Sequence, residues 1–186
     1  EDMLELEHIA PLTNWVRNIR SKKADKKVPY FDPLDGGVKA RCLFLLEAPS
    51  GKAIESRFVS RDNHDETAKR FLVLNEKAGL ARKETVIWNV VPWYIGSGRK
   101  IRRANLEDIL SALPYLDQFL PLLQNIKAII LVGKTAQATE PWLKYKMPTT
   151  KTFLCPHLSP RNVNRDKNVI PKFRKSLGEI VKYLGV

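Results

Sequence analysis

The sequence predicts an α/β protein, specifically a three-layer α/β/α sandwich with a central, mainly parallel four-stranded sheet. Four short apolar runs, bounded by proline, glycine or polar residues, have the length and composition of buried strands. Segments with apolar residues at helical spacing separate these runs. Because parallel strands need crossover connections, which are usually helices, this alternation favours a parallel sheet covered on both faces.

The N-terminal half begins with a predicted helix, followed by a basic connection at residues 22–27. The run RCLFLLEAPSG, residues 41–51, is the first buried strand, which a proline and a glycine terminate. Residues 63–78 are typical of a helix that ends at Gly79. The residues expected to face the core are Leu12, Trp15, Val16 and Ile19 in the first helix, and Ala68, Phe71, Leu72 and Leu74 in the second.

The C-terminal half supplies the other three strands, TVIWNVVPWY (85–94), KAIILVGKTAQ (127–137, running into a helix) and KTFLCPH (151–157). A pair of helices is predicted over residues 106–123, with a break near Pro114. An amphipathic helix closes the chain. Its apolar face consists of Ile170, Phe173, Leu177, Ile180, Val181 and Leu184.

Length and charge limit the possible classes of protein. The 186 residues (21.3 kDa) predict one domain over residues 1–186, which we expect to be monomeric. A formal net charge of +12 and a pI near 9.8 attract polyanions, so nucleic acid is the leading partner. Charge alone leaves open a basic surface that serves only solubility.

The two cysteines, Cys42 and Cys155, lie far apart and form no metal-binding pattern, so we expect no metal and no cofactor. The chain contains no signal-peptide pattern and no apolar run near the ~18 residues of a membrane span. We therefore expect a cytoplasmic protein with reduced thiols, nucleoid-associated if bacterial, and no membrane partner.

Polar residues follow the predicted strands, where ligands bind in open parallel sheets. Asn89 interrupts a hydrophobic run, and a buried amide without partners costs about 1–3 kcal/mol. Either a backbone group of a neighbouring loop satisfies this amide, or a ligand with adjacent donor and acceptor atoms does, such as a nucleobase. The other segments at these strand ends are Glu47–Gly51, Gly133–Thr135 and His157–Asn162.

His157 lies in the loop HLSPRN, where a structural role and a catalytic role are both open. Pro156 and Pro160 restrict the backbone on both sides of it. Ser159 can reach a phosphate, and Arg161 extends from the same turn. The loop would thus supply chemistry on a base together with contacts to a nucleic-acid backbone.

Five motifs in this order resemble the uracil-DNA glycosylase superfamily over roughly residues 40–165: LLEAPSG, SRFVSRDN, WNVVPW, LVGKTA and HLSPRN. The resemblance implies a glycosylase that flips uracil out of DNA, hydrolyses its N-glycosidic bond and leaves an abasic site. The implied partners are uracil-containing DNA and abasic DNA, with free uracil as product.

The resemblance also implies roles for single residues. Asn89 would read the uracil edge, and His157 would donate to uracil O2 as the base departs. Glu47 would position a water or the loop backbone, with Asp62 and Asn63 in reserve if they do not cap a helix. Phe58 would stack on the base unless it belongs to the core, Ala48 and Ser50 would line the base pocket, Arg161 would act as a wedge, and Ser159 and Asn162 would contact DNA.

Three departures from the family pattern limit these expectations. With two cysteines the chain should lack the iron-sulfur cluster of the branch whose motifs it resembles. Ala48 stands where a water-activating aspartate is usual, and Ser50 stands where a tyrosine excludes thymine. The usual general base is therefore missing, and thymine must be rejected by other residues or only weakly.

The stretch GSGRKIRRAN, residues 96–105, is similar to the basic loop of glycosylases that bond covalently to their product site. Ala104 stands near the position of their histidine, so we expect no covalent adduct. The loop is either a noncovalent DNA clamp or a solvated basic segment. The clamp residues would be Arg99, Lys100, Arg102 and Arg103.

Two other functions remain open. A noncatalytic DNA-binding or abasic-site-binding protein on the same fold would keep the basic loop and Arg161 but release no base. A nucleotide-handling enzyme could use Gly133-Lys134-Thr135, although the GxxxxGK spacing of a phosphate-binding loop is absent.

Overall fold

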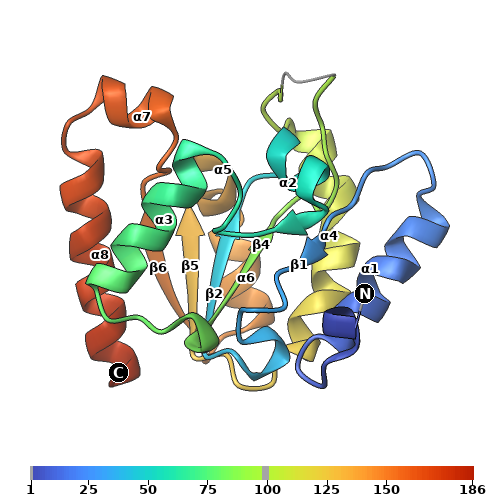
Figure 1. Ribbon diagram of the computed structural model, residues 1–186, viewed down its shortest axis with the longest axis horizontal. Helices are drawn as coiled ribbons and strands as arrows, with labels where there is room; N and C mark the ends of the chain where they lie inside the picture. Colours follow the sequence, from blue (N-terminus) through green and yellow to red (C-terminus); the bar gives the residue numbers. More distant parts are fainter. Residues whose placement is uncertain (1, 98–100) are drawn as a thin grey trace.

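Four parallel strands form the central sheet, in the order β4-β2-β5-β6 (Figure 1). They are β2 (Cys42–Leu46), β4 (Thr85–Asn89), β5 (Ala128–Val132) and β6 (Lys151–Cys155). The computed structural model describes residues 2–97 and 101–186. The predicted fold class, a four-stranded parallel sheet with flanking helices, is confirmed, and each of the four apolar runs contains one of these strands.

The helices surround this sheet and connect its strands (Figure 1). They are α1 (Ala10–Lys22), α2 (Gly51–Ser56), α3 (Glu66–Lys77), α4 (Leu106–Phe119), α5 (Lys134–Gln137), α6 (Glu140–Lys146), α7 (Pro160–Arg165) and α8 (Val169–Leu184). Short 3₁₀ helices are η1 (Asp2–Glu5), η2 (Gly37–Lys39), η3 (Arg82–Glu84) and η4 (Leu120–Leu122).

A second sheet of two short parallel strands lies beside β4 and was not predicted. It pairs β1 (Tyr30–Phe31) with β3 (Phe58–Val59). Two residues are too few to show the alternation that identifies a strand in a sequence. The pairing holds the segment between α2 and α3 against the N-terminal part of the chain.

Aromatic side chains fill one face of the central sheet. The side chain of Trp88 in β4 is fully buried and stacks on Phe31, with ring centroids 3.7 Å apart. Trp15 of α1 and Phe119 of α4 complete this cluster, at 5.5 and 6.3 Å from the Trp88 ring. Burying rings of this size is a large part of the hydrophobic stabilisation of the fold.

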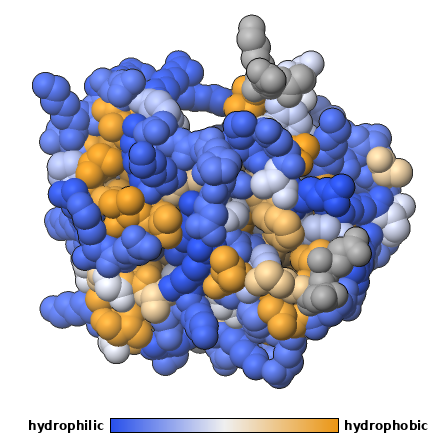
Figure 2. Space-filling model, viewed as in Figure 1, coloured by the Kyte–Doolittle hydropathy of each residue, from blue (hydrophilic) through white to orange (hydrophobic). Residues whose placement is uncertain are grey.

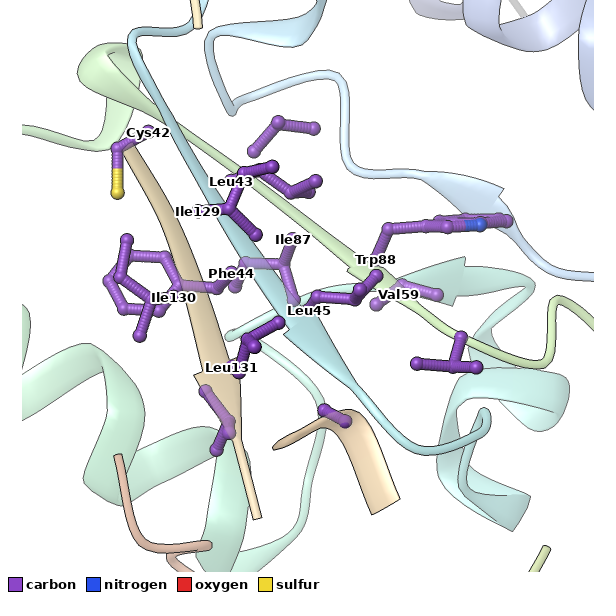
Figure 3. Packing of buried hydrophobic residues seen from close by; sticks show 14 of the residues in the cluster. Cys42, Leu43, Phe44, Leu45, Val59, Ile87, Trp88, Ile129, Ile130 and Leu131 are labelled. Atoms are coloured by element: carbon purple, nitrogen blue, oxygen red, sulfur yellow. The ribbon is translucent and has the colours of Figure 1, made fainter. Parts of the chain in front are cut away.

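The opposite face is covered by α3 and α8. Phe44 of β2 belongs to the buried cluster drawn in Figure 3, and its ring centroid is 4.7 Å from that of Phe71 in α3. Phe71 in turn lies 5.7 Å from Phe173 in α8. Because neighbouring residues of a strand point to opposite faces, Phe44 and its register partner Ile87 lie on this side, while Trp88 lies on the other.

The start of α3 differs from the predicted helix at 63–78. The N-cap is Asp65, whose carboxylate accepts a hydrogen bond from the Ala68 N–H at 2.9 Å. Asp62 is instead paired with Arg82 at 2.9 Å, and the Asn63 amide donates to the Phe58 carbonyl at 2.9 Å. These tertiary contacts hold the preceding turn outside the helix. Of the residues predicted to face the core, Leu72, Ile170 and Val181 are only partly buried.

The predicted break near Pro114 is wrong, because α4 continues through this residue to Phe119. Proline removes one backbone donor from the helix interior. Ala112, Leu116 and Phe119 are nevertheless buried against the rest of the protein, and their burial stabilises the continuous helix. A short 3₁₀ helix, η4, follows where a second helix was expected.

The surface in the view of Figure 2 is mostly hydrophilic, with hydrophobic residues in separate patches. Within residues 2–97 and 101–186, no helix has both the length and the apolar character that crossing a membrane requires.

Candidate active site

Parallel pairing brings the strand ends to one edge of the central sheet. Leu46 pairs with Asn89, and Val132 pairs with Cys155. The segments that leave these strands, among them Glu47 and His157, therefore begin at the same edge. The negative charge of Glu47 acts to raise the pKa of His157, which agrees with the two side chains lying near each other.

Asn89 is the last residue of β4, and only 2% of its surface is exposed. Its amide nitrogen, Nδ2, donates no hydrogen bond to any group in the described part of the chain. A buried donor without a partner costs about 1–3 kcal/mol. The first of the two sequence interpretations, an amide satisfied by a neighbouring loop, does not account for Nδ2. This donor marks a position where a ligand acceptor would be favourable.

The loop that contains His157 fixes the tautomer of its neutral ring. Its Nδ1 lies 3.1 Å from the Ser159 N–H, so Nδ1 accepts and the neutral ring carries its proton on Nε2. Burial lowers the pKa of the imidazole, and the negative charges of Glu47 and Asp65 only partly oppose this effect. The ring is therefore a neutral Nε2–H donor at physiological pH.

Two side chains fix the backbone around His157. The Asn162 amide donates to the His157 carbonyl at 3.2 Å. The Arg70 guanidinium of α3 donates to the Leu158 carbonyl at 3.1 Å. Arg70 was missed by the sequence analysis because no local pattern relates it to a loop 88 residues away.

Gly133 packs directly against His157. Its φ of +87° and ψ of 165° belong to a region that is essentially restricted to glycine. A Cβ at this position would lie 3.1 Å from the Cβ of His157. The turn at residues 133–135 therefore supports the histidine, and its close contact with the His157 side chain disfavours the interpretation as a nucleotide-phosphate loop.

Glu47 anchors a segment rather than projecting freely. Its carboxylate accepts a hydrogen bond of 2.6 Å from the Ala104 N–H, and its carbonyl accepts one of 3.0 Å from the Val91 N–H. The segment around Ala104 is thereby tied to the edge of the sheet. Positioning of the loop backbone, one of the two roles expected of Glu47, agrees with this contact.

The neighbouring loop residues have structural contacts as well. Ser50 is the N-cap of α2 and accepts a hydrogen bond from the Ala53 N–H at 3.1 Å. Ala48 is partly buried. Their expected place in a base pocket stays a prediction.

Phe58 lies in β3, partly exposed, beside the Tyr30 ring at 6.3 Å. It lines a cavity of about 1320 Å³ that also includes Tyr30 and Arg57. Neither Asn89 nor His157 is among the described residues that line this cavity. The structure thus does not place the ring in one pocket with the amide and the imidazole, and the stacking role of Phe58 stays a prediction.

The residues expected to contact DNA fall into two groups. In the first, Ser159 is the N-cap of α7, Asn162 holds the His157 loop, and Arg161 is exposed with no partner among the described residues. In the second, Arg102 is paired with Asp108 through contacts of 2.5 and 2.8 Å, and Arg103 is exposed. Arg99 and Lys100 lie outside the described residues.

The fold and this edge of the sheet can now be compared with known proteins. The model of the uracil DNA glycosylase superfamily matches residues 33–185, and the chain therefore belongs to this superfamily. Membership suggests DNA glycosylase activity in general.

One similar solved structure is an NMR structure of a candidate uracil DNA glycosylase from Methanosarcina acetivorans. It is 17% identical, with a TM-score of 0.46, over 75% of this chain and 90% of the other. No curated protein matches the chain.

Proposed function

We propose that this protein is a monofunctional uracil-DNA glycosylase, which extrudes uracil from DNA and hydrolyses its N-glycosidic bond to leave an abasic site. The observation that carries the proposal is the buried Asn89 amide nitrogen at the ligand-binding edge of the sheet, which has no hydrogen-bond partner among residues 2–97 and 101–186. Superfamily membership and the neutral imidazole donor at the same edge support it.

Recognition of uracil follows from the chemistry of an amide. The Asn89 Nδ2 group would donate to uracil O4, and its carbonyl oxygen would accept from N3–H. Cytosine presents the opposite arrangement at these two atoms, so its binding would leave buried polar groups unpaired. A site of this kind discriminates strongly, because each unpaired group has lost its hydration without a replacement.

Departure of the base places negative charge on uracil O2 and positive charge on the sugar. The Nε2–H of His157 would stabilise the first of these charges through a hydrogen bond. The ring is already neutral and accepts a hydrogen bond from the Ser159 N–H, and Asn162 holds the backbone carbonyl of the same residue, so little reorganisation is needed during the reaction.

Access to the base requires extrusion from the helix, at a cost of a few kcal/mol. Arg161 is exposed in the first turn of α7 and would fill the gap left by the base. Phe58 would have to approach the extruded ring from the β1–β3 sheet.

The second candidate is a noncatalytic protein that binds DNA or abasic sites. Two observations favour it: Ala48 offers no carboxylate, and Glu47 already accepts a hydrogen bond from Ala104. Under our proposal the second oxygen of Glu47 would orient the attacking water.

Release of uracil separates the two candidates. The protein would be incubated with single-stranded and double-stranded oligonucleotides that contain one uracil, and abasic sites would then be cleaved with alkali. We expect cleavage at the uracil and none in a matched oligonucleotide with cytosine at that position. Tight binding of abasic DNA without any cleavage at uracil would reject the glycosylase and support the noncatalytic protein.

Replacing Gly133 by alanine tests the support of His157. We expect a loss of stability on the order of 1–3 kcal/mol, because alanine disfavours this backbone conformation. We also expect roughly ten- to a hundredfold slower uracil excision, because the new Cβ displaces the imidazole. Thermal unfolding and single-turnover excision measure the two effects.

Gly178→Ala is the matched control for Gly133→Ala. Gly178 lies within α8, and a Cβ there meets nothing within 4 Å. Alanine should stabilise this helix by up to about 1 kcal/mol and leave excision unchanged. If Gly133→Ala excised uracil at the wild-type rate, close packing of Gly133 on the histidine would have no functional role.

A further inference from the structure

A basic surface on α7 and the first half of α8 shares only Arg161 with the residues expected to bind DNA. Residues 160–176 contain six basic residues and a single acid, Asp166. The basic residues, all exposed, are Arg161, Arg165, Lys167, Lys172, Arg174 and Lys175. Lys172 pairs with Asp166 at 3.3 Å, which leaves the other charges without a carboxylate partner in the described structure.

A groove of about 740 Å³ runs between this surface and the end of β6. Its lining includes His157 and Asn162 of the candidate active site, and the basic residues Lys134, Arg165, Lys172 and Lys175. Two carboxylates, those of Asp166 and Glu179, also line it, so cations remain in excess. We call it the α7–α8 groove.

We propose that the α7–α8 groove binds the phosphate backbone of the DNA strand that flanks the extruded nucleotide. Repeated phosphates are the ligand that suits a cluster of lysine and arginine side chains, most of which have no carboxylate partner in the described structure, because each contact releases condensed counterions. The groove shares His157 with the candidate site, and a strand held at that residue would enter it. This inference rests on the proposed function for the identity of its ligand.

Position in the fold makes the expected footprint asymmetric. The groove lies at β6, one outer strand of the sheet, whereas Asn89 lies on β4, the other outer strand. The protein would therefore hold the DNA more firmly on one side of the uracil than on the other. Arg102, on the segment tied to Glu47, already uses its guanidinium to bind Asp108.

A triple variant tests the groove, namely Lys134→Ala, Arg165→Ala and Lys175→Ala in one chain. The matched control removes the same charge at the amino-terminal edge of the sheet, through Lys83→Ala, Lys127→Ala and Lys151→Ala. These lysines are exposed and lie at or just before the starts of β4, β5 and β6, the edge opposite to His157. Thermal unfolding would establish that both variants are folded.

The readout is binding of a fluorescent, uracil-free duplex at increasing salt concentration. We expect the slope of log K against log salt to become shallower by about 2–3 in the groove variant, since each lost phosphate contact removes about 0.9. The control should keep the wild-type slope. An unchanged slope in the groove variant, or an equal reduction in the control, would overturn the inference.

A second measurement uses duplexes with uracil near one end or near the other. Wild-type protein should excise the two uracils at different rates, and the groove variant should lose this difference. Equal rates for the wild type would contradict an asymmetric footprint. If the wild type released no uracil while the groove variant alone had the shallower slope, the proposed function would fail and the groove would stand as a nucleic-acid surface.

Discussion

Replacing Asn89 by alanine is expected to reduce uracil excision by several orders of magnitude while the protein stays folded. The amide would be the group that matches both O4 and N3–H of uracil, and a site that loses such a pair of hydrogen bonds loses most of its discrimination and transition-state binding. Single-turnover excision from single-stranded and double-stranded oligonucleotides measures the loss. Excision at the wild-type rate would remove Asn89 from this role.

The unfolding free energy of Asn89→Ala provides an independent test of whether this asparagine has a structural role. A structural asparagine loses hydrogen bonds on mutation and destabilises the protein, but the Asn89 Nδ2 group donates none to the described chain. Removing this buried donor removes its desolvation cost and offsets the small cavity that alanine leaves. We expect an unfolding free energy close to that of the wild type, as at many sites that favour function over stability.

Asn75→Ala is the control for Asn89→Ala. Asn75 is another buried asparagine, 1% exposed, and its amide donates to the Phe71 carbonyl at 2.7 Å within α3. Asn75→Ala should lower the unfolding free energy, because this hydrogen bond is lost, and leave the rate of uracil excision unchanged. An equal loss of excision in both variants would indicate a general effect of removing a buried amide.

Replacing His157 by alanine is expected to slow excision roughly 10²- to 10³-fold, which is the usual effect of removing one donor to a developing negative charge. His157→Gln keeps an N–H donor and should restore part of the rate. An effect of alanine on substrate binding alone, with no effect on the single-turnover rate at saturating DNA, would contradict a role in the chemical step.

Acid sensitivity follows from the protonation state of this histidine. Burial holds the pKa of His157 below its ordinary value of 6.5, so the unfolded chain binds the proton more readily. The stability from the neutral ring is complete above pH 6.5 and decreases as the pH falls through the lowered pKa. Protonation would also break the hydrogen bond from the Ser159 N–H, because Nδ1 could no longer accept.

Comparison of the wild type with His157→Gln isolates this effect. The unfolding free energy of the wild type should decrease more steeply below pH 6.5 than that of the variant, because glutamine does not titrate. The excision rate of the wild type should be level above this pH. Parallel stability curves for the two proteins would indicate that His157 does not titrate differently on folding.

The central sheet and much of its core could be predicted from the sequence. An apolar run such as residues 42–46 can form a strand that is buried on both faces wherever it lies, so its local composition is sufficient. Asn89 was recognisable for the same reason, because one amide in such a run has to find a partner. In the structure it is the last residue of β4 and only 2% exposed.

Other features depend on residues that are distant in the sequence. The continuation of α4 through Pro114 depends on burial of Leu116 and Phe119, and the late start of α3 depends on the pairing of Asp62 with Arg82. The two-residue strands of the second sheet exist only as a pair. Helix and strand propensities are properties of one segment at a time, so they carry no information about these contacts between distant residues.

The sequence by itself determined which residue types stand at the strand ends, namely an amide in β4 and an imidazole after β6, because burial and proline restrict these positions locally. The tertiary structure alone decided that the amide nitrogen has no described partner, that Gly133 packs on His157, that Glu47 holds Ala104, and that basic residues line a groove leading from the histidine. The physical reason is that hydrogen-bond satisfaction and charge clustering are relations between segments, and only folding brings those segments within contact distance.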